Sequence, residues 1–287
     1  MTALASLLDA LHGDQPVIAA ELRPPRAELA ASEGRDAWID TYHAVRRLSR
    51  GGTYVFLTDS AVGTAEEDNL RHLVANLGTD VPRDHVVPFL TCKHPLGYCL
   101  SYAERARQHG FPTLVVLGGD HAVGIPRCVD HAWELRRMIR EHEVSLVLGG
   151  WANPHADAAS QVRYLLDPVF TAEFYLTQIV SHHNRAPVER FISEANRAGV
   201  SAPGVFGVFY YRSATRATLD ALGQFLPVPV DALRAEFAAG ATAQEVCART
   251  VRALIDLGAR HFYISNLPLS RASRTLGEIM ELVRVTA

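Results

Sequence analysis

The chain has 287 residues and a formal net charge of −3, from 28 lysine and arginine residues against 31 aspartate and glutamate residues. This balance provides no basic field for nucleic acid, and no basic patch is interleaved with aromatic residues. No apolar run reaches the ~18 residues of a membrane span. We therefore expect neither a nucleic-acid partner nor a membrane partner.

The amino-terminal residues and the cysteines bear on the cellular compartment. Residues 2–12 have an amphipathic pattern without the positively charged start of a signal peptide, so we expect a helix there. The four cysteines, at positions 92, 99, 128 and 247, have no CxxC spacing and no small secreted framework around them. Both observations favour a cytoplasmic protein.

Eight short apolar runs follow one another along the chain, and nearly every one ends on a polar residue able to do chemistry. They cover residues 17–21, 54–58, 86–92, 114–120, 146–153, 174–178, 205–211 and 262–266. In a (β/α)8 TIM barrel, apolar side chains fill the interior and catalytic groups come from the carboxyl ends of the strands. Such a barrel uses ~250 residues, and no Pro-, Gly- or Ser-rich linker divides this chain. We predict one (β/α)8 barrel domain over residues 1–287.

Between these runs the hydrophobic period changes from 2 to 3.6, which is typical of alternating strands and helices. Helical patterns cover residues 36–50, 65–77, 97–109, 126–142, 156–166, 185–198, 213–225, 242–257 and 270–285. An extra helix is expected near residues 229–237, before the last strand.

Glu21 is the first residue with a case for catalysis. It ends the first run, and Pro24 and Pro25 stop the strand after it because proline has no backbone N–H. A partly desolvated carboxyl at the barrel mouth would have a raised pKa and could act as a general acid near neutral pH. The alternative is an ion pair with Arg23 or Arg26 at the rim.

Asp120 and Gln178 end two further runs. Asp120 follows Gly118 and Gly119, which allow a ligand close to the backbone, and its carboxylate could accept paired hydrogen bonds from a heterocycle such as a pterin. The Gln178 amide both donates and accepts, so it could bind the same kind of edge. The alternatives are a helix N-cap for Asp120 and a buried, satisfied amide for Gln178.

Histidines just beyond the ends of the runs suggest a rival class, a metal-dependent barrel hydrolase. They are His94, His121, His155, His182 and His183, with Asp120 as a further candidate ligand. The chain has no HxH in its first run and no HExxH, so the ligands would have to converge from separate loops without a local spacing signal. We therefore predict no metal site.

Four segments together resemble the 5,10-methylenetetrahydrofolate reductases. They are Glu-x-x-Pro-Pro-Arg at 21–26, Leu-Thr-Cys at 90–92, Gly-Gly-Asp at 118–120 and Thr-Gln at 177–178, in the order of that family and at about its spacing. The resemblance implies a barrel in which Glu21 protonates the folate to open its five-membered ring, Asp120 binds the pterin and Gln178 contacts folate. It also implies contacts from Thr58 and Leu267 to the cofactor or substrate.

The chain departs from that family where the family binds flavin. Phe89 stands in place of a histidine, Gly118 in place of an arginine, and residues 149–154 in place of a Tyr-Pro-Glu-x-His-Pro segment. Asp167 replaces a lysine near the flavin diphosphate, and a carboxylate repels phosphate. Residues 209–214 leave a substrate-sandwiching aromatic without a clear counterpart. Bound FAD is therefore doubtful.

These departures favour reduction of 5,10-methylenetetrahydrofolate to 5-methyltetrahydrofolate by direct hydride transfer from NADH or NADPH, a step of one-carbon metabolism that serves methionine biosynthesis. The residues assigned to the nicotinamide cofactor are Thr91, Gly118, Gly119, Gly150 and Asn153. Glycines 118, 119, 149 and 150 would leave room for it at the barrel mouth. The rival hypotheses are the metal-dependent hydrolase and a non-catalytic folate-binding barrel. No residue pattern indicates the oligomeric state.

Overall fold

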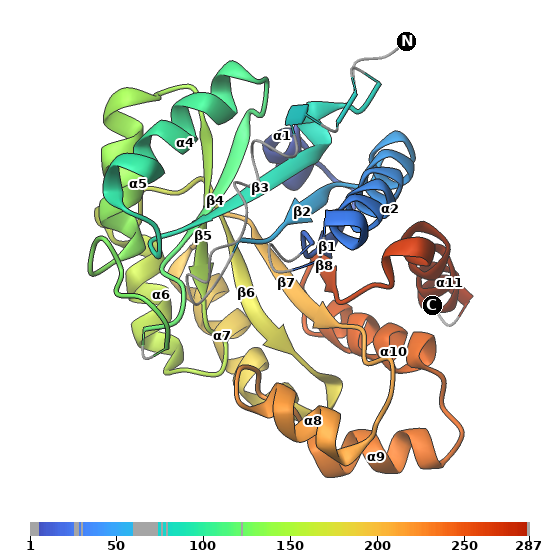
Figure 1. Ribbon diagram of the computed structural model, residues 1–287. Coiled ribbons are helices and arrows are strands. Elements are labelled where there is room, and N and C mark those ends of the chain that lie inside the picture. Colours follow the sequence, from blue (N-terminus) through green and yellow to red (C-terminus); the bar gives the residue numbers. More distant parts are fainter. Residues whose placement is uncertain are drawn as a thin grey trace.

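The computed structural model describes residues 6–25, 29, 31–59, 74–75, 77–78, 80–121 and 123–285. Within these ranges eight parallel strands form a closed barrel, in which each strand pairs with the next and β8 pairs with β1 (Figure 1). The strands are β1 (Ile18–Leu22), β2 (Val55–Leu57), β3 (Val86–Thr91), β4 (Thr113–Leu117), β5 (Val147–Ala152), β6 (Phe174–Val180), β7 (Gly204–Phe209) and β8 (His261–Ser265). The predicted (β/α)8 barrel is confirmed, and each apolar run overlaps one strand.

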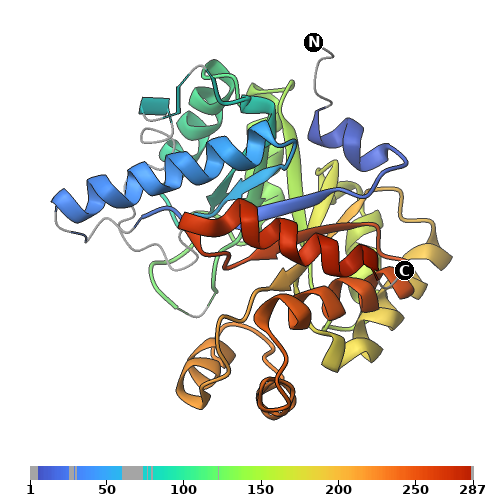
Figure 2. The same cartoon turned by 90° about the vertical axis from the view of Figure 1, so that its right-hand side faces the viewer.

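Helices alternate with the strands along the chain, and most of them lie on the outside of the barrel (Figure 2). In the described ranges they are α1 (Leu7–His12), α2 (Ala31–Arg50), α4 (Leu96–Gln108), α5 (Ala132–His142), α6 (Ala158–Leu166), α7 (Arg185–Ala198), α8 (Arg216–Gly223), α9 (Val230–Ala238), α10 (Ala243–Asp256) and α11 (Ala272–Val285), with short 3₁₀ helices η1 (Arg83–His85), η2 (Pro168–Phe170), η3 (His182–Asn184) and η4 (Leu269–Arg271). Helix α9 is the expected extra helix. The helix predicted at 65–77 falls almost entirely outside the described residues. None of the helices within the described ranges has the length and hydropathy required to cross a bilayer.

Two predicted helix starts are wrong. The helix expected over 36–50 already begins at Ala31. The pattern at 126–142 becomes helical only at Ala132, because the preceding segment is tied to the end of β3 instead. The ammonium of Lys93, the only lysine in the chain, donates to Val123 O at 2.7 Å and to Ile125 O at 2.6 Å, and Cys128 N donates to a β3-end carbonyl. Lys93 is 1% exposed. These bonds hold the β4–α5 loop over the barrel.

Strand alternation decides which side chains face the barrel interior. Ala19 and Phe56 belong to the interior cluster, whereas Ala20 and Val55 pack in the layer beneath the helices. Successive side chains of a strand point to opposite faces. Glu21 therefore shares the inward face of Ala19, one step nearer the carboxyl end of β1.

Helix α1 closes the amino end of the barrel. Its Leu7 and Leu11 are 0% and 2% exposed and pack in the interior cluster with Val17 and Tyr54. The Tyr54 hydroxyl also donates to Ser6 O at 3.3 Å, just before the helix. Since apolar side chains fill this end, the carboxyl ends of the strands form the accessible face.

Candidate active site

A cavity of about 740 Å³ lies at the carboxyl ends of the strands. Its lining includes the predicted residues Glu21, Thr58, Thr91, Gly118, Gly119, Asp120, Asn153 and Gln178. The structure thus brings together every predicted site residue except Gly150 and Leu267. The other lining residues are Asp59, Phe89, Leu117, Arg127, His131, Ala132, Trp133, Arg136, Trp151, Gln161, Tyr164, Phe225 and Leu226.

The carboxyl of Glu21 lies at the inner end of this cavity. The hydroxyl of Ser265, at the end of the neighbouring strand β8, donates to Glu21 Oε1 at 2.5 Å. Burial raises the pKa of the Glu21 carboxyl to about 7, although the hydrogen bond from Ser265 acts in the opposite direction. The partner of Glu21 that sequence reasoning missed is therefore Ser265, which stands one residue before the end of the eighth apolar run. Arg26, one of the two rim partners considered, lies outside the described residues.

Gln178 reaches the cavity through an irregularity in β6. The register between β6 and β7 shifts between Leu176 and Ile179, so the two residues between them do not follow the regular pairing. The Thr177 hydroxyl fills the gap by accepting from Gly207 N at 3.1 Å and donating to Gln178 O at 2.9 Å. Gln178 Oε1 accepts from Ile179 N at 2.9 Å, which orients the amide with its NH₂ group as the part available to a ligand.

Asp120 is held by its own loop. Its Oδ1 accepts from Val123 N at 3.2 Å, within the segment that Lys93 fastens to β3. The alternative role as N-cap of the next helix is wrong, because α5 begins at Ala132 and its N-cap position is His131. The carboxylate of Asp120 thus stays at the edge of the cavity.

A third carboxylate in the cavity, Asp59, was not predicted from the sequence. Asp59 directly follows Thr58, and its side chain is 6% exposed. It accepts from Thr91 N at 2.7 Å and Thr91 Oγ1 at 2.9 Å, and it contacts His94 Nε2 at 2.8 Å. These contacts fix the Thr91 hydroxyl at the cavity wall. The only signal in the sequence is an aspartate immediately beyond the second run.

Gly118 stands in place of an arginine of the family, yet the structure brings another arginine beside it. A Cβ atom built on Gly118 would lie 2.8 Å from Arg127 Cζ, so the guanidinium of Arg127 occupies the space beside this glycine. Arg127 donates to Gly119 O and, at 3.3 Å, to Asp130 O. A positive charge thus enters the cavity from the β4–α5 loop and not from the end of β4.

Two of the glycines expected to leave room for a ligand instead make room for core side chains. A Cβ on Gly149 would lie 2.6 Å from the Phe174 ring inside the barrel, and one on Gly150 would lie 2.7 Å from the Phe170 ring in the helix layer. Gly150 does not line the cavity, because strand alternation turns it outward. Leu267 is 3% exposed, packs in the helix-layer core and is not among the residues that line the cavity.

Asn153 and Asp167 flank α6 in the sequence: Asn153 directly follows β5, and Asp167 directly follows α6. Asn153 lines the cavity, where its N donates to Gln161 Oε1 at 2.8 Å and its Oδ1 accepts from His155 N at 3.1 Å. Asp167 is not among the lining residues; its Oδ1 accepts from Val169 N at 2.9 Å and caps η2. The carboxylate expected to repel a phosphate is therefore used as a helix cap.

The histidines considered as metal ligands do not gather around Asp120. His94 pairs with Asp59, and His155 Nε2 lies 2.9 Å from Ile179 O. Over the described residues, the group with metal-ligand spacing is His182, His183 and Glu236, outside the cavity lining. The ligand set on which the hydrolase hypothesis depended is therefore not assembled.

No protein-family profile and no curated protein sequence matches this chain. A solved structure that is similar throughout its length belongs to an uncharacterized protein from Clostridium thermocellum, which binds two copies of 5-methyl-5,6,7,8-tetrahydrofolic acid. The two chains are 13% identical, with a TM-score of 0.70 and coverage of 98% of this chain and 99% of that chain. At this identity the likeness establishes the fold.

Proposed function

We propose that this chain reduces 5,10-methylenetetrahydrofolate to 5-methyltetrahydrofolate with NADH or NADPH, by direct hydride transfer without bound FAD. The observation that carries the proposal is the Glu21 carboxyl, whose pKa of about 7 keeps an acid available inside the cavity near neutral pH. The solved structure of the same fold supports the substrate class, because its ligand, 5-methyl-5,6,7,8-tetrahydrofolic acid, is the product of the proposed reaction.

In this proposal Gln178 and Asp120 bind the pterin. The Gln178 amide presents its NH₂ group, since Oε1 is held by Ile179 N, and the Asp120 carboxylate accepts hydrogen bonds from the amidine-like edge of the ring. Trp151 and Phe89 supply apolar surface within the same cavity. A donor, an anion and aromatic walls are the groups that a flat, hydrogen-bonding heterocycle requires.

Glu21 supplies the proton. Because Ser265 donates to Oε1, the proton of the neutral carboxyl lies on Oε2. Its transfer to N10 of the folate breaks the bond between N10 and the methylene carbon, which leaves a cationic iminium at N5. Addition of a hydride to that carbon gives the N5-methyl group, so the reaction consumes one proton and one hydride. The negative charge of Asp120 favours the cationic form of the substrate.

The remaining part of the cavity is assigned to the nicotinamide dinucleotide. Reduced nicotinamide bound there would supply the hydride. In this proposal the Thr91 hydroxyl, fixed by Asp59, and the polar groups of Asn153 contact the dinucleotide; both residues line the cavity. The guanidinium of Arg127 provides the positive charge that suits a phosphate.

Three observations support the absence of FAD. The cation of Arg127 comes from a loop and already fills the space beside Gly118. Asp167 stands where the resemblance leads one to expect a lysine, so the chain lacks that cation for a diphosphate. Phe89 presents an apolar ring where the resemblance leads one to expect an imidazole. These residues do not fit the flavin arrangement implied by the family.

The proposal is tested by an absorbance spectrum of the purified protein followed by steady-state kinetics with NADH and methylenetetrahydrofolate. We expect no flavin band, NADH oxidation that depends on the folate, and intersecting double-reciprocal lines from a ternary complex. A yellow cofactor that NADH bleaches, together with the parallel lines of ping-pong kinetics, would contradict the flavin-free reaction.

A non-catalytic folate-binding barrel is the second candidate. It is favoured because the similar protein from Clostridium thermocellum binds 5-methyl-5,6,7,8-tetrahydrofolic acid. Such a protein binds 5-methyltetrahydrofolate in calorimetry yet oxidises no NADH or NADPH with methylenetetrahydrofolate. Retention of folate binding without turnover would therefore decide for it.

A further inference from the structure

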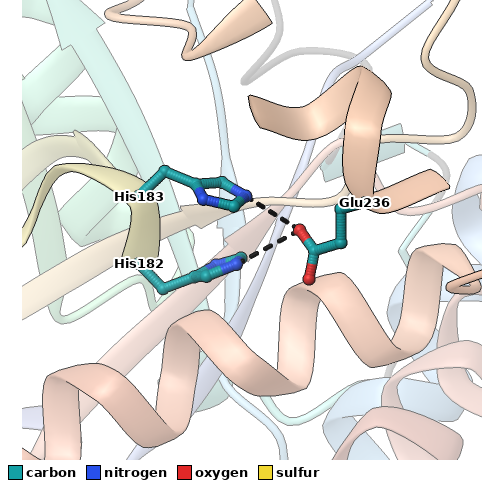
Figure 3. A group of neighbouring side chains, drawn as sticks. All are labelled: His182, His183 and Glu236. Carbon is teal, nitrogen blue, oxygen red and sulfur yellow. Dashed lines mark hydrogen bonds and ion pairs between the residues drawn. The ribbon is translucent and has the colours of Figure 1, made fainter. Parts of the chain in front are cut away.

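Two adjacent histidines and a glutamate converge on one point outside the cavity described above (Figure 3). His182 and His183 lie in η3, directly after β6, and Glu236 lies in α9. His182 Nε2 is 3.2 Å and His183 Nε2 is 2.9 Å from the same atom, Glu236 Oε2. The three side chains are 15%, 23% and 10% exposed, so the point of convergence is mostly shielded from water.

The hydrogen bond behind His182 determines which of its ring nitrogens carries the proton. The Thr250 hydroxyl donates its one proton to Val246 O at 3.2 Å, within the turn of α10. Its oxygen therefore accepts from His182 Nδ1, which is 2.8 Å away. A neutral His182 ring then has a bare lone pair on Nε2, facing the carboxylate of Glu236. Two lone pairs at this distance repel each other unless a cation lies between them.

The second oxygen of Glu236 is also held from behind. Arg249 donates to Glu236 Oε1, which turns Oε2 toward the two imidazoles. The rings of His182 and His183 lie 4.0 Å apart between centroids, so both nitrogens approach from the same side. Metal-binding histidines and carboxylates in proteins are oriented by such outer hydrogen bonds, to the second ring nitrogen and to the second oxygen.

We propose that His182, His183 and Glu236 bind a divalent zinc ion. Two imidazole nitrogens and one carboxylate oxygen are ligands that zinc takes at about 2.0–2.2 Å, which places tetrahedral ligand atoms roughly 3.3 Å apart. The three ligand atoms lie within 4.8 Å of one another, so small side-chain movements complete the geometry. Three protein ligands leave the fourth position of a tetrahedral zinc ion to water.

The position of the ion gives it a structural consequence. The ion joins η3 to α9. The first of these follows β6, the strand that carries Gln178, and the second is the extra helix that a (β/α)8 barrel does not require. The segment between α8 and α9 contributes Phe225 and Leu226 to the wall of the cavity. Zinc at this point would fasten that wall to the end of β6.

The test uses the full chain stripped with a chelator and titrated with ZnCl₂ by calorimetry, and with CoCl₂ by absorbance. No folate or nicotinamide is present, so the result is independent of the proposed reaction. We expect one Zn²⁺ per chain, visible bands of tetrahedral Co²⁺, and a Tm that rises with the Zn²⁺ concentration. His183→Ala and Glu236→Gln should each weaken Zn²⁺ binding at least tenfold and abolish the Tm increase.

His109→Ala is the matched control, because His109 is an exposed histidine at the end of α4. It should bind Zn²⁺ as the unmodified chain does. Thermal melts in chelator identify any variant that fails to fold. If Glu236→Gln is unstable, His183→Ala still decides the test, because it leaves the Arg249–Glu236 ion pair in place. Absence of stoichiometric binding in the unmodified chain, or equal affinity in the His183 variant, would overturn the proposal in favour of a proton-linked ion-pair network.

Discussion

At the scale of single residues, the carboxyl of Glu21 is the group on which the proposed reaction depends. Glu21→Gln keeps the size of the side chain and a hydrogen bond to Ser265 Oγ but removes the transferable proton. We expect kcat to fall by about 10²–10⁴-fold, the usual contribution of general acid–base catalysis, with folate affinity within a few-fold. Stopped-flow NADH oxidation and calorimetry measure the two quantities. A variant that retains full turnover would remove Glu21 from the mechanism.

The raised pKa of Glu21 also predicts the pH dependence. Because the acid form is active, kcat/KM should be constant below pH 7 and fall about tenfold per pH unit above it. Ser265→Ala removes the hydrogen bond that lowers the pKa of Glu21, so the inflection should move to higher pH.

The same ionisation affects stability. The pKa of Glu21 in the folded state lies above its unfolded value of 4.5, so the stabilisation that Glu21 provides is complete below pH 4.5 and is lost as the pH rises to about 7. Glu21→Gln should therefore flatten the decrease of Tm across that interval.

At the scale of elements, the irregularity of β6 decides where Gln178 lies. Thr177→Val keeps the shape of the side chain but removes both hydrogen bonds that bridge the register shift, leaving Gly207 N unsatisfied. We expect a loss of about 1–3 kcal/mol in the free energy of unfolding, the cost of a buried unpaired polar group, and a raised KM for folate. Urea denaturation and steady-state kinetics measure these effects. Thr218→Val on the exposed face of α8 is the control and should change neither. An unchanged KM would show that the irregularity does not position Gln178.

At the scale of the whole molecule, the two ends of the barrel have separate tasks. Leu7 closes the amino end, whereas the cavity lies at the carboxyl end. Leu7→Ala should lower the free energy of unfolding by about 2–5 kcal/mol, as expected for a large-to-small change in a core, while kcat at 25 °C stays unchanged. Leu166→Ala, at a side chain 47% exposed, should cost far less. A large loss of kcat in Leu7→Ala would show that the two ends are coupled.

The architecture could be predicted from local pattern alone. Apolar runs with period 2, alternating with segments of period 3.6, indicate eight strand–helix units, and a parallel barrel buries them. Strand alternation within the first run also makes Glu21 an inward residue at the carboxyl end. Each of these features depends on residues that are neighbours in the sequence, so the local pattern is enough to predict it.

Contacts between distant segments were decided by the tertiary structure. Ser265 meets Glu21 because the last strand pairs with the first, and Arg127 occupies the space beside Gly118 because Lys93 draws its loop over the barrel. Gly150 and Gly118 look alike in the sequence, yet one faces Phe170 in the core and the other lines the cavity. Likewise, His182 and His183 acquire their partner only when α9 packs against η3. The sequence determines which faces are apolar and where strands end, whereas the side chains that meet across the barrel depend on three-dimensional packing that no local spacing encodes.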